Sequence, residues 1–256
     1  MRFLPALLSL VVVSTAAPTN FFDDIYDFSD SLLDYYSKVS QHINRLRHSK
    51  TAVGCDVSKI ALPSHASGLT SPEGLTPMYV AIGRGTQNYT CADSTSNSKP
   101  QAAGAVANLY NATCMAANYP DLLELIPTII WNSSVPLDVS TFPRSKIQLP
   151  ANIGLMGHHF FFDSTTPEFN FNLDSSKQFG IAMTKKGGSI DAPANALKGQ
   201  YGAVPWLYLT TTKGTVGKYK AVYRVDTASG NPPDTCEGQP EKFQMRYSAN
   251  YYFFGN

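Results

Sequence analysis

The stretch that decides the fold lies near the C-terminus, where residues 243–251 read FQMRYSANY. Aromatic residues, Met and Ala occupy its odd-numbered positions, and polar residues occupy the even-numbered ones. Because successive side chains of a strand point to opposite faces, this alternation predicts a strand with one apolar and one polar face. Residues 219–225, which read YKAVYRV, alternate in the same manner, with Lys220 and Arg224 on the polar face.

Further runs of β type, separated by Gly, Pro, Asn and Ser, occupy the chain between Cys55 and these two strands. The runs span 78–82, 87–91, 104–110, 158–163, 180–184 and 204–211. No series of helices alternates with them, so we predict a mainly β fold, an antiparallel β-sandwich or barrel. One short helix is expected around 121–126, and Pro127 would end it.

The N-terminus has the layout of a secretory signal peptide over residues 1–17. Arg2 provides the positive charge, residues 3–13 form an apolar run, and residues 14–17 are small. This run is shorter than the ~20 apolar residues that span a membrane. We therefore expect a secreted, extracellular protein without a membrane anchor, in which residues 18–54 form an N-terminal helical segment and residues 55–256 form a secreted β domain.

Residues 20–50 have the pattern of an amphipathic helix. Apolar residues recur there at spacings of three and four and form one stripe: Phe22, Ile25, Tyr26, Leu32, Leu33, Tyr36, Val39 and Ile43. Because an apolar stripe normally needs burial, we expect this helix to pack on the main domain. A pro-region and a partner-binding helix are the alternatives.

The charge balance argues against a nucleic-acid partner, since 20 basic and 19 acidic residues leave a net charge of +1. Four cysteines in a secreted chain predict two disulfides, and the residues alone leave all three pairings open. No two of the four cysteines have the CxxC spacing that is typical of zinc ligands, so no metal site is expected. Three N-glycosylation sequons, at Asn88, Asn111 and Asn132, agree with a secreted glycoprotein.

Residues 83–88 (GRGTQN) superficially resemble a dinucleotide-binding loop, but Asn88 stands where the fingerprint needs its third glycine. The residues that follow continue as a strand and not as a helix. No cofactor is therefore expected, and the two glycines are interpreted as a bulge or tight turn between two strand segments. Arg84, between these glycines, is a candidate binding residue.

His158 and His159 are the best candidates for side-chain chemistry. One of them could act as a catalytic base, with Asp163 or Glu168 nearby in the sequence. Neighbouring strand residues point to opposite faces, so the pair is not expected to hold one metal ion. No GxSxG nucleophile elbow or reactive thiol accompanies them, so we favour a structural role and expect a protein that is not an enzyme.

Trp206 and Tyr208 fall on one face of the strand expected over 204–211. Together with residues 251–254 (YYFF), they could form a platform on which sugars stack, or a hydrophobic contact surface. The alternative is that these rings simply fill a β core, which is their commoner use.

An ordered series of short motifs resembles a family of secreted fungal proteins with bacterial relatives. The motifs are GRGTQNYTC at 83–91, GAVANLY at 104–110, GHHFF at 157–161, TPEF at 166–169, VPWL at 204–207, VYRV at 222–225, and the stretch 230–249 with Pro232, Pro233 and Cys236. They are similar to the family catalogued as domain of unknown function 3455, and the resemblance runs from about Cys55 to the C-terminus.

This resemblance implies two disulfides, Cys91–Cys236 and Cys55–Cys114. Some fungal members carry a malate dehydrogenase label, which we do not transfer because the third glycine of a dinucleotide loop is missing here.

The leading functional hypothesis is a fungal effector-type binding protein that engages an extracellular protein, for instance by inhibiting a host hydrolase or protease. The first alternative is a cell-wall or carbohydrate-binding module that uses Trp206 and neighbouring tyrosines. The second is an enzyme of unknown reaction built on His158 or His159. The oligomeric state does not follow from the sequence.

Overall fold

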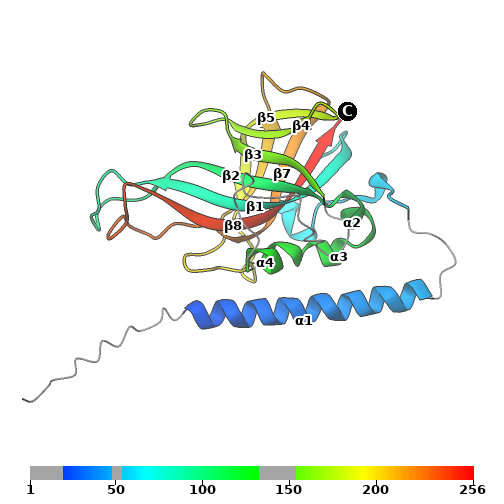
Figure 1. Ribbon diagram of the computed structural model, residues 1–256, viewed down its shortest axis with the longest axis horizontal. Coiled ribbons are helices and arrows are strands. Elements are labelled where there is room, and N and C mark those ends of the chain that lie inside the picture. The colour runs from blue at the N-terminus through cyan, green and yellow to red at the C-terminus, as the bar shows by residue number, and fades with distance from the viewer. Residues whose placement is uncertain (1–19, 48–53, 133–153) are drawn as a thin grey trace, which may run out of the picture.

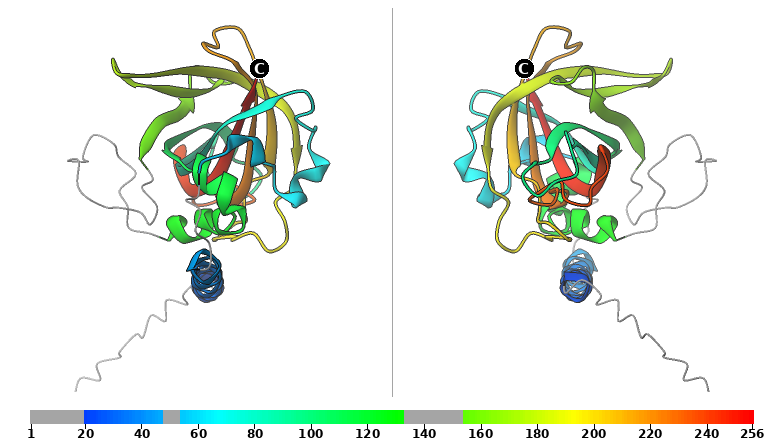
Figure 2. Two further views of the ribbon diagram at one scale, coloured as in Figure 1. Left: turned by 90° about the vertical axis from the view of Figure 1, so that its right-hand side faces the viewer. Right: turned by 90° about the vertical axis from the view of Figure 1, so that its left-hand side faces the viewer.

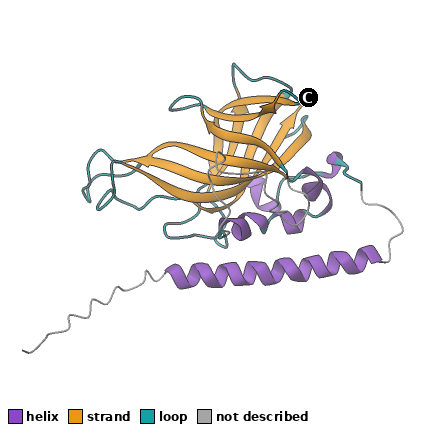
Figure 3. Cartoon of the chain, viewed as in Figure 1, coloured by secondary structure: helices purple, strands orange, loops and turns teal. Residues whose placement is uncertain are grey.

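The computed structural model describes residues 20–47, 54–132 and 154–256, and the side chains of the first helix over 30–46. Its main body is a closed barrel of eight antiparallel strands (Figures 1 and 3). The prediction of an antiparallel sandwich or barrel is confirmed, and the barrel is the form that this chain takes. The signal peptide expected at 1–17 lies outside the described residues.

The strands follow one another around the barrel in chain order, and β8 closes it by pairing with β1. The bounds are β1 Thr76–Thr90, β2 Gln101–Asn111, β3 Leu155–Phe161, β4 Pro167–Asp174, β5 Lys177–Ile190, β6 Trp206–Thr211, β7 Tyr219–Ser229 and β8 Lys242–Gly255. Every strand except β4 overlaps a predicted run. Because β4 falls between two of these runs, its pairing with β3 and β5 was not anticipated.

Both faces of β8 are buried from Tyr247 onward. Its odd-numbered residues over 247–253 point into the barrel, and its even-numbered residues over 248–254 point outward, beneath helices. Two outward polar residues donate hydrogen bonds to helix carbonyls, Ser248 Oγ to the Pro127 oxygen and Asn250 Nδ2 to the Leu123 oxygen at 3.0 Å. The predicted alternation in β8 is therefore confirmed, but only Gln244 and Arg246 of its polar face are exposed to solvent, whereas Ser248 and Asn250 meet the helices.

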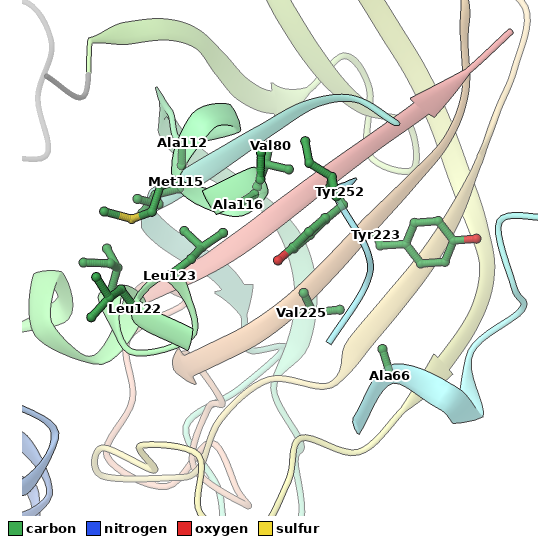
Figure 4. Close-up of a cluster of buried hydrophobic side chains, with 14 of the residues drawn as sticks. Ala66, Val80, Ala112, Met115, Ala116, Leu122, Leu123, Tyr223, Val225 and Tyr252 are labelled. Carbon is green, nitrogen blue, oxygen red and sulfur yellow. The ribbon is translucent and has the colours of Figure 1, made fainter. Parts of the chain in front are cut away.

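Three short helices between β2 and β3 cover this outer face: α2 Thr113–Asn118, α3 Pro120–Leu123 and α4 Ile126–Trp131. Their apolar residues and the outward residues of β1, β7 and β8 form an outer core, shown in Figure 4. The prediction that Pro127 ends a helix was wrong, because Pro127 stands in the first turn of α4. A first-turn N–H has no partner within its helix, so proline is tolerated there.

The interpretation of Gly83 and Gly85 as a bulge or tight turn was also wrong, since β1 runs through both as one continuous strand. A Cβ on Gly83 would lie 2.5 Å from Cε2 of Tyr251, and one on Gly85 would collide with the backbone of Val106. The two glycines therefore let the tyrosine ring and the neighbouring strand β2 approach β1 closely.

The long N-terminal helix α1 spans Asn20–Arg47 and packs on α3 and α4, on the side away from the barrel (Figures 1 and 2). Tyr35 is buried against this layer and Val39 partly so. Leu33, Tyr36 and Ile43 remain exposed at 69%, 60% and 47%. The helix expected over 20–50 is present, but only part of its apolar stripe is covered.

Two disulfides join distant parts of the chain, Cys55–Cys114 and Cys91–Cys236. They are the pairs that the family resemblance implies. The first ties the N-terminal segment, with its short 3₁₀ helices η1 Val57–Lys59 and η2 Ser64–Gly68, to α2. The second joins the segment after β1 to the segment before β8 at one end of the barrel.

Candidate ligand site at the barrel mouth

The barrel end that carries the Cys91–Cys236 disulfide has a cleft. At this end, here called the mouth, β1 ends at Thr90, β2 begins at Gln101 and β8 begins at Lys242. These three strands reach farther to the left in Figure 1 than the other strands. The cleft has a volume of about 640 Å³ and is lined by Asn88, Tyr89, Thr90, Ala103, Lys242, Phe243 and Gln244.

Tyr89 and Phe243 form the aromatic part of the cleft. Their rings stack with centroids 5.5 Å apart and an angle of 25° between planes. The Tyr89 hydroxyl donates to the Gly230 carbonyl at 2.9 Å, and burial raises the pKa of this phenol to about 12. Phe243 is only partly buried. The Tyr89 phenol is therefore fixed and neutral, and Phe243 is the more exposed of the two rings.

A buried arginine lies inside the barrel, on the inner face of β7. Arg224 pairs on β7 with Tyr251 and Leu207, points inward and is 8% exposed. Its Nη2 donates to the Pro205 carbonyl at 2.8 Å, and the Tyr251 phenol lies beside the guanidinium. Its Nε has no acceptor. No carboxylate of the described residues approaches it within the 4 Å of a salt bridge.

Gln87 is a second inward residue with an unused donor. It lies two positions before Tyr89 on β1 and faces Met245 of β8. Its Nε2 is buried without an acceptor at hydrogen-bonding geometry, although the side chain lies beside the Tyr247 hydroxyl. Buried donors are normally paired, so Gln87 and Arg224 are two exceptions on one inner surface.

Two tyrosines and a histidine complete this polar interior. The Tyr247 and Tyr251 hydroxyls are 2.8 Å apart, and burial raises the pKa of both phenols. The His159 ring stacks on Phe169 with centroids 4.2 Å apart, and its Nδ1 donates to the Glu168 carbonyl at 2.8 Å. Burial lowers the pKa of His159 to about 4, so its imidazole is neutral near pH 7.

The residues proposed for catalysis are not brought together. His159 points into the barrel, whereas His158 points outward, with its Nδ1 3.1 Å from Asn108 Oδ1. Burial lowers the pKa of His158 as well. Asp163 forms its own exposed turn by accepting from the backbone N–H groups of Thr165 and Thr166. No acid–base pair of these side chains therefore exists in this arrangement.

Three residues proposed for binding are used inside the structure. Trp206 is 3% exposed in the outer core, so it offers no face on which a sugar could stack. Tyr208 is half-buried beside Tyr223, with ring centroids 5.2 Å apart. Arg84 is buried under α4, where its Nε donates to the Ile130 carbonyl at 2.8 Å. A cation at the last turn of a helix satisfies its carbonyls, so this role is structural.

The sequon residues differ in their surroundings. Asn111 and Asn132 are exposed. Asn88 is half-buried on β1, lines the cleft, and accepts a hydrogen bond from Thr86 Oγ1 at 3.1 Å. Glycosylation of these three residues stays a prediction.

Arg224 and Gln87 were missed as site residues by sequence reasoning. The alternation places Arg224 on the polar face of its strand, opposite the apolar Tyr223 and Val225. In the barrel these two apolar residues face outward into the outer core, and Arg224 faces inward. The residue opposite Arg224 on β8 is Tyr251, which lies in a row of inward-facing tyrosines. This neighbour is known only once the pairing of the strands is known.

Neither a metal cluster nor a membrane-spanning helix is found in residues 20–47, 54–132 and 154–256. No group of three or more His, Cys, Asp or Glu side chains there could hold a metal ion. No helix in the same part of the chain is long and apolar enough to cross a membrane.

Fold and site together define a class: a disulfide-linked, closed eight-stranded antiparallel barrel with a polar interior next to its mouth. The chain belongs to the family described as "Protein of unknown function (DUF3455)", which matches residues 72–255. A second family, "Protein of unknown function (DUF2990)", matches residues 8–70 and covers α1. No curated protein and no solved structure is similar enough to the chain to count as a match.

Proposed function

We propose that this chain is a secreted binding protein that recognises an extracellular protein through the mouth of its barrel. The observation that carries the proposal is the cleft of about 640 Å³ at the disulfide-linked end, with a partly exposed Phe243 ring in its wall. Disulfides persist in oxidising, extracellular surroundings, which supports secretion.

The rigidity of the mouth supports a role in recognition. Cys91 and Cys236 are bonded to each other, and the backbone N–H of each donates to the opposite loop, to Glu241 and Ser98 respectively, at 2.8 Å in both cases. Loops held in one conformation lose little entropy when they bind a partner, so such a surface binds more tightly than a mobile one.

The chemistry of the mouth supports a protein as the partner. Phe243 and Met245 are partly exposed there, next to the exposed Gln244 amide and the Lys242 ammonium group. Protein interfaces are enriched in aromatic residues and methionine, with polar groups around them. Sugar stacking would need an exposed ring face, and Tyr89 is 7% exposed.

Affinity capture from the extracellular fluid in which the protein acts tests the proposal. The wild-type protein should retain a protein partner, and Phe243→Ala should lose at least tenfold in the amount retained. Phe179→Ala is the matched control, because Phe179 is a 49% exposed aromatic residue near the start of β5, at the opposite end of the barrel. Equal capture by both variants, or binding to insoluble polysaccharide alone, would contradict a protein-binding mouth.

A further inference from the structure

The outer side of α1 carries a row of exposed apolar side chains. Among the described residues, ten large apolar side chains are exposed, and four of them lie on this helix: Leu33, Tyr36, Ile43 and Leu46. The other six each come from a different segment of the chain. No other described element lies beyond α1 on the side away from the barrel (Figures 1 and 2). Exposed apolar side chains that gather on one surface are typical of a contact site.

The row has the spacing of a coiled-coil seam. Positions 33, 36, 40 and 43 are separated by three, four and three residues, and they hold Leu, Tyr, Ser and Ile. Because an α-helix turns once in 3.6 residues, these four positions share one face. Tyr35 and Val39, which pack towards the barrel, lie on a different face of the helix. The helix can therefore contact the barrel domain and a second helix at the same time.

The charges of α1 are separated along its length. Residues 20–34 contain five aspartates and no basic residue, whereas residues 35–47 contain Lys38, Arg45 and Arg47 and no acidic residue. Lys38 bonds to Asp34 of the same helix at 2.8 Å, so the opposite charges are strongest towards the two ends. A parallel second copy would place aspartates beside aspartates, whereas an antiparallel copy places the acidic half beside the basic half. Because each exposed ion pair contributes little, these charges select the orientation and the apolar row provides the affinity.

We infer that α1 pairs with α1 of a second copy of this chain in antiparallel orientation, around a two-fold axis near residue 38. Leu33 of each copy then lies against Ile43 of the other, and residues 30–34 lie alongside residues 42–46. A two-fold axis makes such a contact self-complementary, so both copies bury the same row. The seam is short, so we expect a dimer that dissociates in the micromolar range. This inference goes beyond the proposed function, because the mouth is not part of the seam.

Sedimentation equilibrium of the secreted, disulfide-bonded protein tests the inference. The apparent mass should rise from that of one copy to that of two through the micromolar range and rise no further, because a two-fold contact is closed. Leu33→Ala/Ile43→Ala should weaken the dimer by roughly tenfold or more. The double variant should keep its helix, since alanine is the best helix former. A wild type that stays monomeric up to hundreds of micromolar, or a double variant that dimerises as the wild type does, would overturn the inference.

Phe162→Ala/Val216→Ala is the matched control. These two apolar side chains are 70% and 54% exposed, in the loops before β4 and β7. The control removes a similar amount of exposed apolar surface outside α1, so its dimer should be as stable as that of the wild type. Equal weakening in the two double variants would mean non-specific association and would contradict a seam on α1.

A salt titration of the dimer tests the orientation of the two helices. In the antiparallel pair, raising NaCl from about 50 to about 500 mM should weaken the dimer several-fold, because salt screens the attraction between the acidic and basic halves. In a parallel pair, salt would screen repulsion between like charges and strengthen the dimer. The chain has a net charge of only +1, so repulsion between the two whole molecules does not mask this difference. A dimer that salt strengthens would therefore overturn the antiparallel arrangement.

Three further results separate the seam from the mouth and from a membrane surface. Phe243→Ala should dimerise as the wild type does, and loss of its dimer would assign self-association to the mouth and overturn the inference. Dimerisation of a wild type that captures no extracellular protein would support the seam and contradict the proposed function alone. A monomeric wild type that binds vesicles of phosphatidylcholine and phosphatidylserine, when Leu33→Ala/Ile43→Ala does not, would show that the row contacts lipid, and the inference would fail.

Discussion

Burial moves the pKa values of two residues in opposite directions. Burial lowers the pKa of His159 from 6.5 to about 4 and raises the pKa of the Asp226 carboxyl from 3.8 to about 7. For His159, the unfolded chain binds a proton that the folded chain rejects, so stability falls as the pH falls from about 6.5 towards 4. For Asp226, the folded chain keeps a proton that the unfolded chain releases, so stability falls as the pH rises from about 4 towards 7.

Two substitutions should separate these opposing contributions. Relative to the wild type, His159→Gln should gain stability as the pH is lowered from 6.5 to 4. Asp226→Asn should gain stability as the pH is raised from 4 to 7, and asparagine tolerates the φ of 51° at this position. Urea unfolding of the three proteins across pH 4–7 measures both slopes. Curves parallel to that of the wild type would show that neither group titrates as described.

Gly85 is the glycine whose lack of a side chain matters most. A Cβ there would overlap the backbone carbonyl of Val106 on β2, and backbone cannot move aside as a side chain can. Gly85→Ala should therefore lower the free energy of unfolding by roughly 3 kcal/mol or more. Gly188→Ala is the control, since its nearest contact would be 4.0 Å from Tyr208, and it should stay within about 0.5 kcal/mol of the wild type. Chemical denaturation compares the two.

At the scale of elements, α1 is held by a small number of contacts. His42 Nε2 lies 3.0 and 3.1 Å from the two carboxylate oxygens of Asp121 in α3, and its ring meets the Tyr119 ring edge-on with centroids 4.8 Å apart. Tyr35 supplies the main buried surface of the helix. With Leu33 and Tyr36 exposed, α1 is the element whose docking depends most on individual residues.

His42→Ala should loosen α1 without unfolding the barrel. The loss of a partly exposed bond to a carboxylate is expected to weaken docking by about 1 kcal/mol. Hydrogen exchange over residues 30–46 should then become several-fold faster, while exchange in β1 and β8 stays unchanged. Arg45→Ala, on the exposed side of the same helix, should leave all three segments as in the wild type. Equal acceleration in the barrel would mean that α1 and the barrel unfold together.

At the scale of the whole molecule, the two disulfides close loops of different length. Sequence separations of 59 for Cys55–Cys114 and 145 for Cys91–Cys236 correspond to upper figures of ~4 and ~5 kcal/mol in the chain-entropy description. The difference in stability between them is therefore expected to be small. Their difference in position is large, because only the second lies at the mouth.

Replacing each pair with serine should separate stability from binding. Both double variants should lose several kcal/mol of stability, within about 1 kcal/mol of each other. Only the variant without Cys91–Cys236 should lose partner capture below its melting temperature, since its mouth loops are no longer joined. Unchanged capture by that variant would show that partner binding does not depend on the Cys91–Cys236 disulfide.

Local patterns predicted much of the barrel and little of its site. The alternation over 243–251 is that of β8, and adjacent His158 and His159 do face opposite ways. Strand β4 was not predicted, although Phe169 and Phe171 alternate there with asparagines, a pattern that is typical of a strand. Arg224 could not be recognised, because inward and outward faces look alike in a strand whose two faces are both buried.

The amino-acid sequence by itself determined that this chain forms antiparallel strands with two distinct faces and contains an even set of cysteines, since alternation and composition act over a few residues. Only the tertiary structure decided that the strands close into a barrel, that helices bury Ser248 and Asn250 of β8, and that Arg224 and Gln87 face inward on the side of the tyrosines. These outcomes depend on pairing between β1 and β8, more than 150 residues apart, and no local pattern specifies what will pack against a given face.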